Sequence, residues 1–264
     1  MSGNPFSLAG KTALVTGATG YFGQSIAQSL MEAGAEVYLN GRNAAAVEAL
    51  VATFQERKMA ARPAIFDILS EEETANFFDV LGSAPLDILV NNAYAGATGA
   101  IEVADAQNYR DSYEITVVVA HRLLRGALEN LRVAKHVNGD ASVINIASMY
   151  GVVSPDLRVY QGKPDANGSF YGAAKAALIQ WTRYGACEFG PEGIRFNVLT
   201  PGAFPSPAAQ GRYPQLIAQL EKKVPLGRIG VAHEIGGVVA FLSSPAASYV
   251  NGATIAVDGG WTAW

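Results

Sequence analysis

The chain has 264 residues, half of them hydrophobic, with 16% charged residues and a formal net charge of −4. This length and apolar content suit one large α/β domain, and the mildly acidic balance argues against nucleic-acid binding. The single cysteine excludes an intramolecular disulfide, and we expect a cytoplasmic protein. No secretory leader or apolar run of about 20 residues is visible, so no membrane span is expected. No histidine has a second ligand at metal-binding spacing, so no metal site is predicted.

Short apolar runs alternate with helical patterns along the whole chain. Strands are expected at Thr12–Thr16, Glu36–Asn40, Arg62–Phe66, Ile88–Asn91, Ser142–Ala147, Arg195–Leu199 and Thr254–Val257. Helices are expected at Gln24–Ala33, Ala44–Arg57, Glu71–Leu81, about Ala106 to Arg132, Phe170–Phe189 and Ala232–Leu242. Continuous apolar strands that alternate with helices favour a doubly wound parallel sheet with helices on both faces. No linker divides the chain, so residues 1–264 are interpreted as a single domain.

Three glycines lie between the first expected strand and the helix after it. Gly17, Gly20 and Gly23 recur at every third residue. Glycine allows a tight turn and close approach of a ligand, and the following helix offers free N–H groups to a diphosphate. An ordinary strand–helix turn is the alternative. The position after the first strand of a βα series favours dinucleotide binding.

The end of the second expected strand bears on the choice of cofactor. It carries no carboxylate, and Arg42 follows it. A carboxylate would hold the ribose 2′-hydroxyl of NAD, whereas an arginine accommodates the 2′-phosphate of NADP. We therefore predict NADP, with NAD as the alternative because the glycine turn holds no second basic residue. Asp67, after the third strand, could accept a hydrogen bond from the adenine or cap the helix near Ser70.

Tyr171 and Lys175 are four residues apart in a mostly apolar helical stretch. Side chains at this spacing leave a helix on one face, one turn apart. A lysine ammonium favours the phenolate and lowers the pKa of the tyrosine, which would make it a general acid or base near neutral pH. Ser148 follows the fifth expected strand, at the sheet edge where such folds bind ligands. A helix cap is the alternative role for Ser148.

Several motifs occur in a characteristic order: Thr16–Gly23, Asn91-Asn92-Ala93, Ser148, Tyr171 with Lys175, Pro201-Gly202 and Asp258-Gly259-Gly260. In this order they resemble the short-chain dehydrogenase/reductase family, over nearly the whole chain. The resemblance implies a Rossmann-type seven-stranded parallel sheet in the order 3-2-1-4-5-6-7 and a homotetramer or dimer. It also implies that Tyr171 exchanges the substrate proton, Lys175 binds the nicotinamide ribose and Ser148 orients a carbonyl or alcohol.

The resemblance further implies which residues contact the cofactor. They are Gly17, Thr19, Gly20, Tyr21, Phe22, Arg42, Asp67, Ile68, Asn91, Ala93, Tyr171, Lys175, Pro201, Gly202 and Phe204. The partner implied is a small-molecule ketone or secondary alcohol, to which the cofactor supplies hydride and the protein supplies the proton.

Three features depart from the usual family pattern. The glycine spacing is typical of a longer, sugar-nucleotide-modifying branch, which leaves an epimerase or dehydratase with retained cofactor as one alternative. Thr116 stands where many members have an asparagine that anchors a proton-relay water, which leaves a non-catalytic dinucleotide-binding protein as another. The segment from Ser148 to Tyr171 is longer than usual.

Two irregular loops are expected beside the substrate, at about residues 151–169 and 202–214. The first is rich in polar and aromatic side chains, which suit a sugar, a polyol or a sugar nucleotide. A surface loop or an oligomer contact is its alternative role. The second resembles the mobile substrate loop of the family, stiffened by prolines. After it, Trp261 and Trp264 could pack on a neighbouring subunit or in the core.

Overall fold

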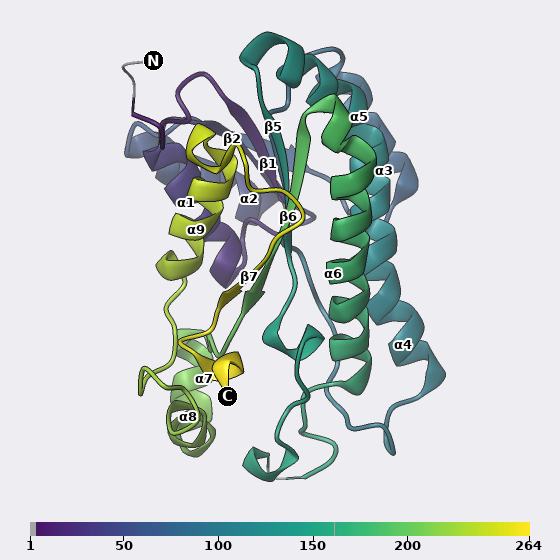
Figure 1. The fold of residues 1–264 in the computed structure, drawn as a ribbon, viewed down its shortest axis with the longest axis vertical. Coiled ribbons are helices and arrows are strands. Elements are labelled where there is room, and N and C mark those ends of the chain that lie inside the picture. Colours follow the sequence, from purple (N-terminus) through teal and green to yellow (C-terminus); the bar gives the residue numbers. More distant parts are fainter. Residues whose placement is uncertain (1–3, 161) are drawn as a thin grey trace.

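A seven-stranded parallel sheet forms the centre of the computed structural model, which describes residues 4–160 and 162–264 (Figure 1). The strand order is β3-β2-β1-β4-β5-β6-β7, so the predicted order is confirmed. The strands are β1 (Thr12–Val15), β2 (Glu36–Gly41), β3 (Ala61–Ile65), β4 (Ile88–Asn91), β5 (Ala141–Ile146), β6 (Ile194–Pro201) and β7 (Thr254–Val257). Because all neighbours are parallel, every strand ends at the same edge of the sheet.

Helices cover both faces of the sheet, as Figure 1 shows with the sheet between two helical layers. Helices α1 (Tyr21–Glu32), α2 (Ala44–Glu56) and α9 (His233–Ser243) cover one face, and α3 (Glu71–Leu81), α5 (Val119–Asn138) and α6 (Ser169–Phe189) cover the other. Leu14 packs under the second layer, whereas Ala13 and Val15 pack under the first. Successive strand side chains point to opposite faces, so a sheet covered on both sides needs continuous apolar strands.

The long helix expected from Ala106 to Arg132 is interrupted, and that prediction is corrected. Helix α4 (Ala106–Tyr113) passes into a π-helical turn, η1 (Glu114–Val118), before α5 begins. The interruption coincides with the β-branched run from Ile115 to Val119, which is a poor helix former. Helix α5 continues to Asn138, where Gly139 adopts a left-handed conformation (φ 79°) and ends it.

A short helix forms within the second predicted loop and another begins at its last residue, which corrects that expectation. They are α7 (Pro207–Arg212) and α8 (Pro214–Glu221). Each begins with a proline, which is tolerated there because the first helical N–H needs no partner. The first predicted loop is irregular apart from short 3₁₀ turns. Gln161 within it, like residues 1–3, lies outside the described residues.

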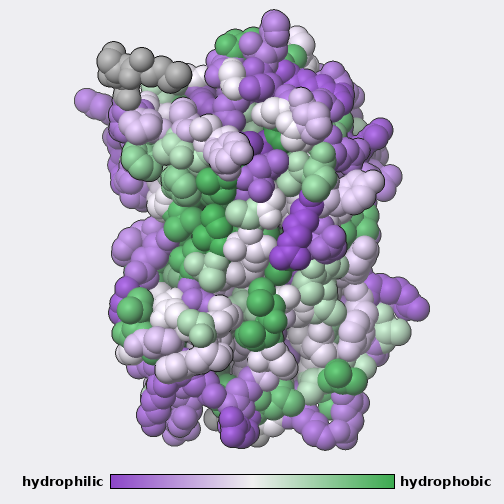
Figure 2. Space-filling model, viewed as in Figure 1, coloured by the Kyte–Doolittle hydropathy of each residue, from purple (hydrophilic) through white to green (hydrophobic). Residues whose placement is uncertain are grey.

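The face seen in Figure 2 gathers apolar side chains over α9, beside the edge strand β7. Val238 and Phe241 of α9 are only half-buried, and every residue of β7 is at least partly exposed. No helix among the described residues combines the length and apolar character that crossing a membrane requires.

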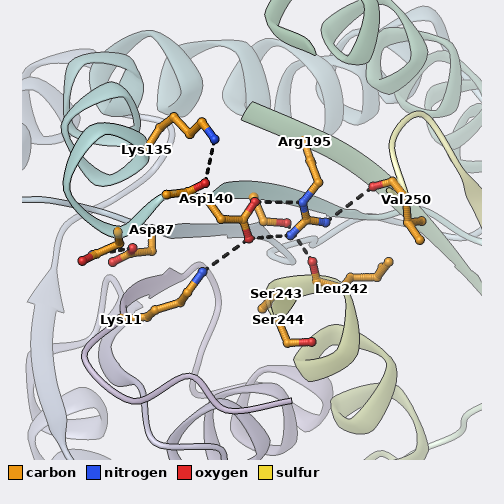
Figure 3. Close-up of polar contacts among 12 residues, drawn as sticks. Lys11, Asp87, Lys135, Asp140, Arg195, Leu242, Ser243, Ser244 and Val250 are labelled. Atoms are coloured by element: carbon orange, nitrogen blue, oxygen red, sulfur yellow. Dashed lines mark hydrogen bonds and ion pairs between the residues drawn. The ribbon is translucent and has the colours of Figure 1, made fainter. Parts of the chain in front are cut away.

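A network of charged side chains closes the opposite, amino-terminal edge of the sheet (Figure 3). Asp140, which precedes β5, accepts two hydrogen bonds from Arg195 of β6, at 3.0 and 2.9 Å. It also pairs with Lys11, which precedes β1, at 3.3 Å. Arg195 and Lys11 are 6% and 9% exposed, so one carboxylate balances two largely buried cations.

Candidate active site

A cavity of about 520 Å³ lies at the carboxyl edge of the sheet, past the ends of β1 to β4. Most predicted cofactor residues line it: Gly17, Thr19, Gly20, Tyr21, Phe22, Arg42, Asp67, Ile68, Ala93 and Phe204. Asn91, Tyr171, Lys175, Pro201 and Gly202 do not line this cavity. Phe22 and Phe204 close one side of it with an edge-to-face contact at 5.3 Å between ring centroids. The cavity therefore joins segments far apart in the sequence.

The glycine turn is packed so closely that two of its positions require glycine. Gly17 has a φ of +63°, and a Cβ there would lie 2.9 Å from the Ala93 Cα. A Cβ on Gly23 would lie 2.2 Å from the carbonyl oxygen of Gly17. Helix α1 begins at Tyr21, three residues before the expected start, and no side chain caps its first N–H groups. Those N–H groups and the helix dipole offer an anion site beside the cavity.

Arg42 and Asp67 lie at the ends of β2 and β3, on the wall of the same cavity. Arg42 is exposed and precedes α2, whose first turn carries no acidic residue. A guanidinium next to a helix N-terminus is a favourable environment for phosphate. Ser70 is the residue that caps α3. One carboxylate oxygen of Asp67 accepts the Leu69 N–H at 3.0 Å, so Asp67 does not cap the helix itself.

Thr16 ties the glycine turn to the end of β4. Its hydroxyl accepts the backbone N–H groups of Asn92 and Ala93 at 3.0 and 3.2 Å, and the Asn92 side chain donates to the Thr16 carbonyl at 2.8 Å. Asn91 is buried below them and donates to the Asn145 side chain at 2.8 Å. Thr16 and Asn92 therefore position the cavity wall, a role that the sequence analysis did not assign to them.

Ser148, Tyr171 and Lys175 meet where the end of β5 packs against α6. Ser148 caps a 3₁₀ turn, η2 (Met149–Gly151), by accepting the Tyr150 N–H at 3.1 Å. A Cβ on Gly151 would lie 2.9 Å from the Lys175 carbonyl carbon, which shows how closely this turn packs on α6. Lys175 is only 3% exposed, and its Nζ donates to the Ile146 carbonyl at 2.7 Å. Ser148 therefore caps this turn, and its predicted role toward a substrate stays a prediction.

Burial decides the protonation of the Tyr171–Lys175 pair. It lowers the pKa of Lys175 to about 7, because a buried ammonium lacks hydration. It also raises the pKa of Tyr171, which the neighbouring Ser148 hydroxyl partly offsets. The expected lowering of the tyrosine pKa is therefore wrong for the chain without cofactor, since burial of the phenol is the largest effect on its pKa. Tyr171 is a protonated donor in this environment.

Tyr94 completes the surroundings of Lys175, although the sequence analysis missed it. Its ring makes an edge-to-face contact with Tyr171 at 4.8 Å between centroids. The Lys175 Nζ lies 5.1 Å from the Tyr94 ring centroid and 5.6 Å from that of Tyr171. The ammonium is thus held between two aromatic rings, which favours its charged form. The only sequence signal was an aromatic residue directly after Asn-Asn-Ala.

A small internal cavity of about 10 Å³ adjoins Lys175, Asn91 and Thr116. The Thr116 hydroxyl and the Asn91 side-chain oxygen are buried without a partner among the described residues. The π-helical turn η1 brings Thr116 to this place. A cavity of this size with several polar groups around it suits one water molecule.

Two further tyrosines lie in the segment between Ser148 and Tyr171. The Tyr150 and Tyr160 hydroxyls are 3.2 Å apart. Burial raises the pKa of both phenols, so both stay neutral donors and acceptors. Within residues 4–160 and 162–264, no group of three or more His, Cys, Asp or Glu side chains is arranged to hold a metal ion.

Comparison with known proteins agrees with this geometry. Residues 17–262 match a family model described as enoyl-(acyl carrier protein) reductase. The chain is 34% identical to a rhamnolipids biosynthesis 3-oxoacyl-[acyl-carrier-protein] reductase of Pseudomonas aeruginosa, over 97% of this chain and 98% of the relative. A putative gluconate dehydrogenase from Agrobacterium tumefaciens superposes with a TM-score of 0.89 at 28% identity, covering 99% of this chain and 100% of the other.

A second solved structure with the same fold holds a cofactor. It is a gluconate 5-dehydrogenase from Burkholderia cenocepacia in complex with NADP and tartrate. It superposes with a TM-score of 0.84 at 28% identity and covers 98% of both chains. A family model matches nearly the whole chain, and a relative that is 34% identical aligns over nearly its full length. The chain therefore belongs to the short-chain dehydrogenase/reductase family.

Proposed function

We propose that the chain is an NADP-dependent oxidoreductase that interconverts a secondary alcohol and a ketone. The observation that carries the proposal is the meeting of Ser148, Tyr171 and Lys175 at the same sheet edge as a cavity lined by the glycine turn. Similarity to reductases and to an NADP-bound dehydrogenase supports it. Hydride transfer needs a proton donor beside the cofactor, and this arrangement supplies one.

The proposed reduction adds a hydride and a proton to the carbonyl. A nicotinamide cofactor held by the glycine turn and Arg42 would supply the hydride. Tyr171, kept protonated by its raised pKa, gives its proton to the carbonyl oxygen as charge develops there. Ser148 donates a hydrogen bond to the same oxygen and stabilises that charge. Lys175 in its charged form stabilises the phenolate that remains, and the reverse sequence oxidises the alcohol.

Reprotonation of Tyr171 is proposed to pass through Lys175 and the small internal cavity. A water there would lie beside the Lys175 ammonium and would form hydrogen bonds with the Thr116 hydroxyl and the Asn91 side-chain oxygen. Threonine offers one hydroxyl where asparagine offers an amide, so it can still hold a water, with fewer groups. This arrangement argues for a catalytic protein over the non-catalytic alternative.

A hydroxylated substrate is the class that the site supports best. The paired hydroxyls of Tyr150 and Tyr160 could each exchange hydrogen bonds with substrate hydroxyls. The similar protein from Burkholderia cenocepacia is named a gluconate 5-dehydrogenase, which is consistent with such a substrate.

We also propose a homo-oligomer, a tetramer or dimer, supported by the half-buried apolar face of α9 and the exposed edge strand β7. The single domain over residues 1–264 and the cytoplasmic location expected from the sequence stay predictions. Sedimentation at several protein concentrations measures the oligomeric state.

The function is tested by titrating the purified protein with NADPH and NADH and following cofactor fluorescence, then assaying hydroxylated ketones with NADPH. We expect tighter NADPH binding and net NADPH consumption. Tyr171→Phe should lower turnover by about 10²- to 10⁴-fold, the range for a general acid, with little change in NADPH affinity. Turnover retained by Tyr171→Phe contradicts the role of Tyr171. Binding without net NADPH consumption on any ketone favours the epimerase alternative.

A further inference from the structure

A third cavity, of about 340 Å³, lies apart from the cofactor cavity and shares no lining residue with it. Its volume falls within the range of about 300–1,000 Å³ that is typical of small-molecule sites. The polar and aromatic residues that line it are Ser154, Asp156, Lys222, Lys223, Trp261 and Trp264. A cofactor bound in the first cavity would therefore not fill this third cavity.

This cavity lies on the substrate side of the sheet edge. Its lining comes from the segments that follow β5, β6 and β7, whereas the cofactor cavity is built mainly past β1 to β4. Figure 1 shows α8, the C-terminus and the segment after β5 gathered at the same end of the molecule. Ser154 follows Ser148 by a single 3₁₀ turn, so one short segment connects the reacting centre with this cavity.

Among the side chains of the lining, two lysines outnumber one carboxylate. Asp156 is already engaged: it accepts the Arg158 guanidinium at 2.8 Å and the Arg158 N–H at 3.0 Å, and it pairs with Lys223. Lys222 is exposed and forms no ion pair with any residue of the described chain. Because Asp156 is already neutralised by its own partners, the ammonium of Lys222 is available to attract an anion.

Two tryptophans supply flat walls beside this charge. Trp261 packs on the apolar cluster of Ala203, Ile217 and Leu220. Asp258 holds the turn that carries it, by accepting the Gly260 N–H at 2.9 Å and the Thr262 N–H at 3.0 Å. Trp264 is 84% exposed, so its indole offers an apolar face and an N–H donor to a ligand. Cationic groups beside indole rings suit a molecule with a carbon skeleton and an anionic end.

We propose that this third cavity is a substrate subsite for the carboxylate end of a hydroxylated acid, with Lys222 as the charged contact and Trp264 beside the carbon skeleton. The inference rests on the proposed function and narrows its substrate class to sugar acids. The carbonyl or alcohol that reacts is then at the opposite end of the molecule, toward Tyr171.

The test compares D-gluconate with D-sorbitol, which differ only in a carboxylate against a hydroxymethyl group at one end. Each is titrated by calorimetry into protein saturated with NADPH, so that no turnover occurs. We expect the wild type to bind gluconate at least tenfold more tightly than sorbitol, and added salt to reduce that preference. Lys222→Glu should weaken gluconate binding at least tenfold more than sorbitol binding. The matched control is Lys58→Glu, an exposed lysine that lines none of the three cavities.

Three outcomes overturn the subsite. They are equal binding of the two ligands by the wild type, equal loss of both in Lys222→Glu, and the same loss in Lys58→Glu. Trp264→Ala should weaken both ligands, because it removes the wall that they share, and unchanged binding removes Trp264 from the site. Failure of the wild type to bind NADPH contradicts the proposed function instead. In that event the same titrations without NADPH still decide whether the carboxylate is recognised.

Discussion

At the scale of single residues, the buried ammonium of Lys175 between two phenol rings is the most unusual feature of the site. Burial alone disfavours its charge, and the pKa of about 7 means that the group titrates near neutral pH. The Tyr94 and Tyr171 rings and the Ile146 carbonyl act in the opposite direction. The charge of this lysine therefore depends on neighbours that the sequence does not place beside it.

The role of Tyr94 can be tested through the pH dependence of ketone reduction. Reduction needs Lys175 charged, so kcat/KM should decline as pH rises through about 7. Tyr94→Leu removes one ring, which should lower the pKa of Lys175 further and move the decline to lower pH. Tyr94→Phe keeps the ring and loses only the hydroxyl contact with Ser112 at 3.2 Å. Its pH profile should match the wild type, and an equal shift in both variants refutes the ring's role.

Arg42 carries the prediction about cofactor choice. Arg42→Ala should weaken NADPH binding by about 10- to 100-fold, since hydrogen bonds between charged groups contribute about 1.5–3 kcal/mol. NADH lacks the 2′-phosphate, so its affinity should change little. Fluorescence titration with both cofactors measures the ratio. An equal loss for both would show that Arg42 does not bind the phosphate.

At the scale of elements, the close contact between the glycine turn and α1 shapes one wall of the cavity of about 520 Å³. Gly23→Ala would place a Cβ 2.2 Å from a backbone oxygen, so α1 must move away from the turn. We expect lower thermal stability and the loss of most NADPH affinity. Gly237→Ala in α9 is the matched control, because nothing lies within 4 Å of its Cβ. NADPH affinity preserved in Gly23→Ala would contradict the required close contact.

At the scale of the whole molecule, the Asp140 network in Figure 3 joins β1, β5 and β6 at the edge opposite the site. Burial by itself would raise the pKa of Asp140, but Arg195 and Lys11 bring it below its ordinary value. A carboxyl with a lowered pKa stabilises the fold above its unfolded pKa of about 4 and stops doing so as the pH falls through the folded value. The network should therefore contribute to acid denaturation.

Asp140→Asn tests this contribution. At pH 7 it should reduce the free energy of unfolding by about 3 kcal/mol, because it leaves two buried cations without their carboxylate. The difference from the wild type should begin to shrink below about pH 4, where Asp140 of the unfolded chain becomes protonated, and should vanish once the pH falls below the lower folded pKa. Urea unfolding at pH 7 and pH 3.5 measures both values. A constant difference between the two pH values would contradict the linkage.

The sequence by itself determined the sheet, the family and most residues that line the cavity of about 520 Å³. Continuous apolar strands, a glycine turn and ordered motifs are local signals, and each reports a requirement of nearby backbone. Gly17, Arg42 and Ala93 could be placed on the cavity because each lies at the end of a strand, and parallel strands end at one edge.

Only the tertiary structure decided the protonation of Tyr171, the place of Tyr94, the π-helical turn at Thr116 and the cavity between Lys222 and Trp264. Burial and ring contacts join residues from several elements, so no window of sequence contains them. The second predicted loop, at about residues 202–214, could not be assigned from its prolines either. Two of these prolines begin α7 and α8, because a proline fits the first turn of a helix as well as it fits a loop. Local sequence motifs were enough to identify the family, whereas long-range packing determined the burial and the protonation of the residues in those motifs.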